Sequence, residues 1–147
     1  MPKCGDVMTL TPATCEPGDP VTRAAEIMKR EDVGAVPVVE SQASQRLVGI
    51  VTDRDIVLRV VAAGRTVEGT LVRDAMTNAP AYCREDEDIR HAVKYMAERQ
   101  VRRMPIVDLE GRLRGIISQA DVATRVNQDK TTGEMVEAIS EPGVRQH

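Results

Sequence analysis

Hydrophobic residues along this chain recur first at helical and then at strand spacing, and polar breaks separate the segments. A helix is expected from Pro20, with Asp19 as its cap and Pro20 in the first helical position. Its apolar residues follow helical spacing: Val21, Ala24, Ala25 and Met28. Runs rich in Val and Ile predict strands at 35–39 and 47–51, and a second helix is expected over about 53–63.

The same order of elements occurs a second time. Apolar residues again occupy one helical face: Ile89, Ala92, Val93, Met96 and Ala97. Strands are expected at 104–107 and 113–117, and a helix over about 119–126. Short extended pieces at 13–15 and 81–83 open the two sets. The pattern predicts an α+β, sandwich-like fold of two pseudo-symmetric β-α-β-β-α repeats.

The residues themselves also repeat. The segment "GDVMTLTPATC" matches "RDAMTNAPAYC", and Met8 lies 68 residues before its counterpart Met76. Further on, "LVGIVTDRDI" matches "LRGIISQADV", and Gly49 lies 66 residues before Gly115. The two missing residues fall in a loop, where a change of length is tolerated best.

Composition narrows the classes of protein that fit. The 147 residues suffice for one compact module, and the core must be aliphatic because Phe and Trp are absent. With only two Tyr as aromatic residues, a base-stacking surface is not expected, and a net charge of −3 provides no basic excess for phosphate backbones. General nucleic-acid binding is therefore not expected.

The start of the chain lacks an apolar core of signal-peptide length, and no run approaches the roughly 20 apolar residues that cross a bilayer. These features predict a soluble, cytosolic protein without a membrane segment. Cys4, Cys15 and Cys83 have no C-x-x-C spacing and are expected to be free thiols, although a redox link between Cys15 and Cys83 stays open. His91 is expected on a solvated helix face, and no metal site is expected.

Each repeat places a hydroxyl and a carboxylate where a strand runs into a helix, as Thr52 with Asp55 and as Ser118 with Asp121. Unpaired N–H groups at a helix start favour an anion such as phosphate, and a carboxylate one turn further on can accept bonds from both hydroxyls of a ribose. The same residues are also ordinary helix caps, which need no ligand. Because no nucleophile with base and carboxylate partners and no phosphate-binding glycine loop occurs, catalysis and a catalytic cofactor are not expected.

The chain resembles a tandem pair of cystathionine-β-synthase (CBS) domains, a Bateman module. The resemblance rests on "DVMT" and "DAMT", on "VGAVPVV" and "VRRMPIV", and on "GIVTDRD" and "GIISQAD", and it covers Gly5 to about Val126. The layout is also similar to small hypoxia- or stress-linked CBS proteins of actinobacteria. The expected divisions are repeat 1 at 1–66, repeat 2 at 67–127 and a tail at 128–147, in which Met135, Val136 and Ile139 suggest a short helix.

The resemblance implies a regulatory, energy-sensing or stress-response module that binds AMP, ADP or ATP in a cleft between repeats and signals by a conformational change. It implies two nucleotide sites. One comprises Thr52, Arg54, Asp55, Thr77, Pro80, Ala81, Arg102, Arg103 and Met104. The other comprises Ser118, Asp121, Thr9, Pro12, Ala13, Gly34 and Val36. A scaffold with empty sites and a binder of another adenosyl ligand, such as S-adenosylmethionine, are the alternatives.

The two sites are expected to be unequal. Arg54, Arg102 and Arg103 can surround the phosphates at the first site, whereas Ala120, Gly34 and Ala35 hold the equivalent positions at the second. A homodimer and an unidentified effector protein are expected as partners. The homodimer is expected because these apolar faces exceed what one small sheet must cover: Val21, Ala24, Met28, Ile89, Val93 and Met96.

Overall fold

A computed structural model describes residues 2–129, with the side chains of residues 2–125. The helix suggested by Met135, Val136 and Ile139 lies outside the described residues. The described chain forms two compact units. The first unit comprises residues 12–80 and 110–113, and the second unit comprises residues 2–11, 81–109 and 114–129.

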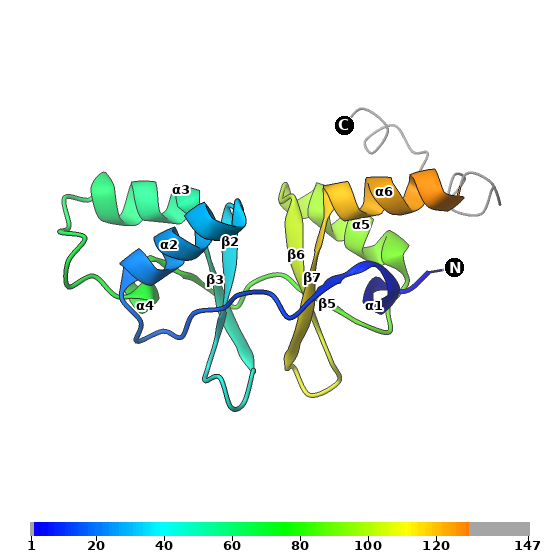
Figure 1. The fold of residues 1–147 in the computed structure, drawn as a ribbon, viewed down its shortest axis with the longest axis horizontal. Coiled ribbons are helices and arrows are strands. Elements are labelled where there is room, and N and C mark those ends of the chain that lie inside the picture. Colours follow the sequence, from blue (N-terminus) through cyan, green and yellow to red (C-terminus); the bar gives the residue numbers. More distant parts are fainter. Residues whose placement is uncertain (1, 130–147) are drawn as a thin grey trace. The chain divides into compact units, whose positions relative to one another are not determined.

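The first unit contains a sheet of order β2-β3-β4, with its helices on one face of β2 and β3 (Figure 1). Its elements are α2 (Val21–Glu31), β2 (Ala35–Val39), β3 (Leu47–Thr52), α3 (Asp53–Ile56), the π-helix η1 (Val57–Val61), α4 (Val72–Ala75) and β4 (Thr77–Asn78). The predicted helix–strand–strand–helix order is confirmed. Val36, Val38, Val39 and Val51 are buried, so the Val-rich runs form strands because they supply the core.

The second unit repeats this plan around a sheet of order β1-β7-β6-β5. Its elements are α1 (Cys4–Val7), β1 (Thr9–Leu10), β5 (Cys83–Arg84), α5 (Ile89–Arg99), β6 (Arg103–Val107), β7 (Leu113–Ser118) and α6 (Gln119–Asp129). Figure 1 shows α5 and α6 on one face of β6 and β7. The α+β class and the two repeated halves are confirmed.

Each unit takes its opening segment from the part of the chain that precedes the other repeat. The N-terminal arm, which we define as residues 2–11, belongs to the second unit, where β1 pairs antiparallel with β7. Residues 72–80 belong to the first unit, where β4 pairs antiparallel with β3. The chain therefore crosses from one unit to the other near Pro12 and again near Pro80.

The start of α2 differs from the prediction. The helix begins at Val21, Pro20 is the cap residue, and the cap has no side-chain hydrogen bond. The Asp19 carboxylate instead accepts a hydrogen bond of 2.8 Å from the Glu16 N–H and pairs with Arg23 at 3.3 Å. Asp19 therefore closes the preceding turn, and its predicted role as the helix cap is wrong.

Two glycines lie opposite β1 and β4, the strands that are exchanged between the two units. Gly49 of β3 is opposite Asn78, and Gly115 of β7 is opposite Leu10. A Cβ atom on Gly49 would lie 2.9 Å from the Thr77 carbonyl oxygen, and one on Gly115 would lie 2.6 Å from the Thr9 carbonyl oxygen. Both distances are shorter than a real carbon–oxygen contact, so the exchange requires glycine at both positions.

Each unit has its own aliphatic core. The first core includes Cys15, Val36, Val38 and Val51, and the second includes Cys83, Met104, Ile106 and Ile117. The three cysteines are free, as predicted, and all three are buried. Burial raises the pKa of the Cys15 thiol to about 11, which keeps it protonated at neutral pH.

Candidate functional site

The junction between β3 and α3 is closed by a reciprocal pair of hydrogen bonds. The Asp55 N–H donates to Thr52 Oγ1, and the Thr52 N–H donates to Asp55 Oδ2, each over 3.0 Å. The Asp53 N–H donates to the Gly34 carbonyl oxygen at 2.9 Å, which places Gly34 beside the helix start. The sequence "TDRD" folds this way because a hydroxyl at the cap and a carboxylate three residues later satisfy two orphan N–H groups.

The junction between β7 and α6 has the same geometry. The Asp121 N–H donates to Ser118 Oγ, and the Ser118 N–H donates to Asp121 Oδ2, each over 3.0 Å. The Gln119 N–H donates to the Arg102 carbonyl oxygen at 3.0 Å. Arg102 therefore occupies in the second unit the place that Gly34 occupies in the first.

These capping boxes explain the two hydroxyls and two carboxylates as helix caps, which was the alternative interpretation of the sequence. They also leave one oxygen of each carboxylate unused. Within residues 2–125, Oδ1 of Asp55 and Oδ1 of Asp121 accept no hydrogen bond from the protein. Each junction thus holds a carboxylate in a fixed orientation with one oxygen available to a ligand hydroxyl.

The exchanged strands bring a further hydroxyl onto each sheet. Thr77 of β4 lies opposite Ile50, two residues before Thr52, and Thr9 of β1 lies opposite Ile116, two residues before Ser118. Both threonines are exposed. Thr52 and Thr77 therefore share one unit, and Ser118 and Thr9 share the other, although 25 and 109 residues separate the members of each pair.

The remaining predicted residues divide between the units. Gly34, Val36, Arg54 and Pro80, with Pro12 and Ala13, lie in the first unit. Ala81, Arg102, Arg103 and Met104 lie in the second. Val36 and Met104 are completely buried within their own cores, so they act first as core residues. The predicted grouping of residues from both units around one ligand stays a prediction.

Three arginine side chains are available to an anion. Arg54 and Arg102 are exposed and Arg103 is half-buried. Within the described residues none of the three forms an ion pair or a side-chain hydrogen bond. A guanidinium group without a protein carboxylate can bind a phosphate through two parallel hydrogen bonds.

Sequence reasoning missed Arg59, which ties the junction helix to the exchanged segment. Its Nη1 donates to the carbonyl oxygens of Ala75 at 3.1 Å and Met76 at 2.7 Å. Arg59 thereby holds the segment that carries Thr77 against η1. The available signal was the repeat itself, because Arg125 stands at the equivalent position 66 residues later.

Sequence reasoning also missed two residues with left-handed backbone. Thr11 has a φ of 52° and Ala79 a φ of 49°, and each precedes the proline where the chain crosses between units. Glycine is the usual signal for such a conformation, and neither residue is glycine. A β-branched or alanine residue held there stores backbone strain, which is common beside functional sites.

His91 lies on an exposed helix face, with Nδ1 3.6 Å from a Glu87 carboxylate oxygen. No cluster of three or more His, Cys, Asp or Glu side chains suited to a metal ion occurs in the part of the chain that the structure describes. None of the described helices is long and apolar enough to span a membrane.

Comparison with known proteins gives two matches to the CBS domain model, at residues 4–62 and 72–128. Hypoxic response protein 1 of Mycobacterium tuberculosis is 36% identical over 126 residues, which cover 83% of this chain and 82% of that protein. The chain is also similar to CBSX2 in complex with AMP, with a TM-score of 0.77, 26% identity and coverage of 88% of this chain and 99% of that one.

A further solved structure is the CBS domain pair of MJ0100 in complex with 5′-methylthioadenosine and S-adenosyl-L-methionine. Its TM-score is 0.72 and its identity 25%, over 87% of this chain and 98% of that one. The two similar folds thus hold ligands that share an adenosine group.

Proposed function

This chain belongs to the CBS-domain family, and we propose that it is a regulatory module that binds AMP, ADP or ATP at the Thr52/Asp55 and Ser118/Asp121 junctions. The observation that carries the proposal is the pair of capping boxes, each of which leaves one carboxylate oxygen available at a helix start. The AMP complex of CBSX2 supports it, because the folds are similar over nearly the whole described chain.

The proposed mechanism is a shift between arrangements of the two repeats. A nucleotide that binds one arrangement more tightly increases the population of that arrangement, and an effector protein recognises the result. CBS pairs act in general as regulatory, non-catalytic modules, and we infer the same role for this protein, with a cytosolic location. The stress-linked role is an inference from its likeness to hypoxic response protein 1.

S-adenosylmethionine is the second candidate ligand, because the CBS pair of MJ0100 holds it. It shares the ribose and base with AMP but carries a sulfonium instead of phosphate. A site that contacts only the ribose, through Asp55 or Asp121, would bind both compounds. A site that also uses arginine would favour the compound with phosphate.

The first prediction tests the ribose contacts. Asp55→Ala and Asp121→Ala should each weaken nucleotide binding at their own site by about 1.5 to 3 kcal/mol, the scale of a hydrogen bond to a charged group. Isothermal titration calorimetry with AMP, ADP, ATP and S-adenosylmethionine measures the loss and identifies the preferred ligand.

Asp88→Ala is the matched control for this experiment, because Asp88 Oδ1 accepts a hydrogen bond of 2.9 Å from the Arg90 N–H at the start of α5. It should cost a similar helix cap without affecting nucleotide affinity. Unchanged affinity in both junction variants and in the double variant would contradict the site assignment. No binding of any tested ligand to the wild type would favour a scaffold with empty sites.

A second prediction concerns the arginines. We propose that Arg54, Arg102 and Arg103 serve the phosphates at the Asp55 site, so that site should bind nucleotide more tightly and prefer more phosphates. Arg103→Ala should reduce ATP affinity and its salt dependence in an Asp121→Ala background. The Arg102 carbonyl oxygen accepts a hydrogen bond at the start of α6, so the arginines could instead serve the Asp121 site. A loss of ATP affinity on Arg103→Ala that is seen only in the Asp55→Ala background would assign them to that site.

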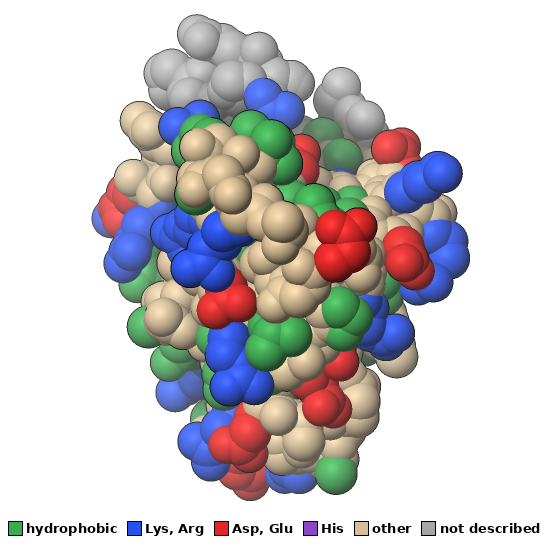
Figure 2. Space-filling view, turned by 90° about the vertical axis from the view of Figure 1, so that its left-hand side faces the viewer, with side chains coloured by type: hydrophobic (Ala, Val, Ile, Leu, Met, Phe, Trp, Pro, Cys, Tyr) green, Lys and Arg blue, Asp and Glu red, His purple; other side chains and the backbone are tan. Residues whose placement is uncertain are grey.

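A third prediction is a homodimer, but on different residues from those expected. Val21, Ala24, Ile89 and Met96 are buried within their own units and provide no spare apolar surface. Exposed apolar residues instead lie within η1, where Val57, Leu58 and Val61 are 54%, 50% and 62% exposed. Figure 2 shows hydrophobic side chains interspersed with charges of both signs on the side of the first unit at the left of Figure 1.

The second repeat has Ala123, Thr124 and Asn127 at the positions equivalent to Val57, Leu58 and Val61, so the fold does not require apolar residues there. We propose that these three pack against a second copy. Leu58→Glu should convert a dimer to a monomer in light scattering, whereas Thr124→Glu, at the equivalent position, should not. A wild-type protein that is only monomeric at micromolar concentration would contradict the proposal.

A further inference from the structure

The three thiols are not distributed as the repeat predicts. Cys15 and Cys83 occupy equivalent positions, but Cys15 lies in the core of the first unit and Cys83 in that of the second. The companion of Cys83 is Cys4, which the N-terminal arm inserts into the same core. Cys4 and Cys83 are 0% and 2% exposed.

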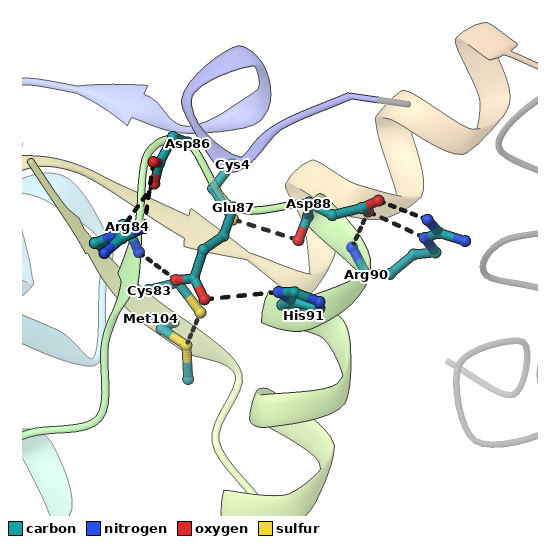
Figure 3. Close-up of polar contacts among 9 residues, drawn as sticks. All are labelled: Cys4, Cys83, Arg84, Asp86, Glu87, Asp88, Arg90, His91 and Met104. Atoms are coloured by element: carbon teal, nitrogen blue, oxygen red, sulfur yellow. Dashed lines mark hydrogen bonds and ion pairs between the residues drawn. The ribbon is translucent and has the colours of Figure 1, made fainter.

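Short sulfur contacts hold the two thiols in this core (Figure 3). Cys4 Sγ donates to the Asp88 carbonyl oxygen at 3.9 Å, and Cys83 Sγ lies 3.5 Å from Met104 Sδ. Interaction with the Cys4 side chain and burial raise the pKa of Cys83 far above its usual value. Both side chains belong to one buried core, and the Cys4 N–H donates to the carbonyl oxygen of Glu87, four residues after Cys83.

The fold itself does not require a thiol on the arm. Val72 is the counterpart of Cys4 in the first unit, where it is completely buried in the core with Cys15. An aliphatic side chain thus meets the packing demand at this position. Only the second unit combines two cysteines, which makes the pair a chemical addition to a repeated scaffold.

The arm is held by a small set of local bonds. The Cys4 N–H donates to the Glu87 carbonyl oxygen at 2.8 Å, and the Gly5 N–H donates to that of Glu85 at 3.0 Å. Its helix α1 has four residues, closed by the Lys3 N–H donating to Asp6 Oδ2 at 2.8 Å. Such a segment opens at a lower free energy than the whole unit, and its opening exposes Cys4 and uncovers Cys83.

We propose that Cys4 and Cys83 form a redox-sensitive pair, which a peroxide converts into an intramolecular disulfide when the N-terminal arm opens. One thiol loses its proton in water, and its thiolate attacks a peroxide oxygen, which yields a sulfenic acid and releases hydroxide. The second thiolate attacks the sulfenic sulfur, the S–S bond forms, and a second hydroxide leaves. With the two thiol protons, hydrogen peroxide is reduced to two water molecules.

The disulfide would fix the arm against β5. Because the same arm carries Thr9 and pairs with β7 beside Ser118, oxidation would also hold that junction in its closed arrangement. The thiol chemistry itself does not depend on nucleotide binding. Burial of both thiols beneath the closed arm makes oxidation slow, so the opening of the arm controls its rate.

Peptide mapping of the full-length protein tests the proposal. The reduced protein is treated with hydrogen peroxide, alkylated, digested without reductant and analysed by mass spectrometry. We expect a Cys4–Cys83 linked pair lighter by two hydrogen atoms, with Cys15 still alkylated, and a higher denaturation midpoint that a reductant reverses. A main product that links Cys15, or one that links two chains, would overturn the proposal.

Matched variants test the pair and the route of access. Cys4→Val, which copies Val72 of the other unit, should fold and form no link, whereas Cys15→Val should form it as the wild type does. Asp6→Ala removes the carboxylate that closes α1 and should speed disulfide formation several-fold. Asp74→Ala removes the equivalent carboxylate of α4 and should leave the rate unchanged. Equal rates in these two variants would overturn arm opening as the controlling step.

Discussion

Gly115→Ala is expected to lower the free energy of unfolding by about 3 kcal/mol, and Gly49→Ala by about 2 kcal/mol. The added methyl at 115 would lie 2.6 Å from the Thr9 carbonyl oxygen and 2.8 Å from Met8 side-chain atoms. The carbonyl belongs to a paired strand and cannot move without breaking the β1–β7 ladder. At Gly49 one of the two nearest atoms is the Met76 sulfur, which can rotate away, so the expected loss is smaller.

Urea denaturation of each variant measures this difference. Gly18→Ala is the matched control, because its methyl would meet only the far end of the Arg73 side chain at 3.2 Å. Its stability should stay within about 0.5 kcal/mol of the wild type. If Gly115→Ala were as stable as Gly18→Ala, the close approach of the exchanged strand would be contradicted.

The two glycines show why the exchange of segments could not be predicted. Each glycine was recognised as the start of a repeated motif, but the reason for it lies on another strand that is far away in sequence. The strands that cross them, β1 and β4, have two residues each, which is too short for a hydrophobic period. The helices α1 and α4 have four residues each and escaped prediction for the same reason.

The long helices and strands could be predicted because their apolar side chains recur at the spacing with which each element faces the core. The Val-rich run at Ala35–Val39 forms β2 with four buried residues, and the expected helix from 119 forms α6. The hydroxyl and carboxylate of each junction were also found, because their spacing follows from local helix geometry. The placement of Cys4 and Cys83 in one core was missed, because it depends on the exchange and not on the repeat.

The largest expected effect is the loss of the N-terminal arm. A chain without residues 2–11 loses a completely buried side chain at Cys4, the packing of Val7 and Met8, and the β1–β7 pairing. Truncation of single core side chains costs about 2 to 5 kcal/mol, and small domains are stable by only about 5 to 15 kcal/mol. The second unit is therefore expected to be strongly destabilised. Hydrogen exchange should show weaker protection in β6 and β7.

The first unit provides the internal control in the same molecule. Its core takes nothing from the arm, so β2 and β3 should keep their protection. A synthetic peptide of residues 2–12 should restore protection to β7 when added in excess, because it supplies the missing edge strand and core residues. The same peptide with Cys4→Asp should fail, because it would bury a charge without a partner. Full protection of β7 in the truncated chain, without any peptide, would show that the second unit does not depend on the arm.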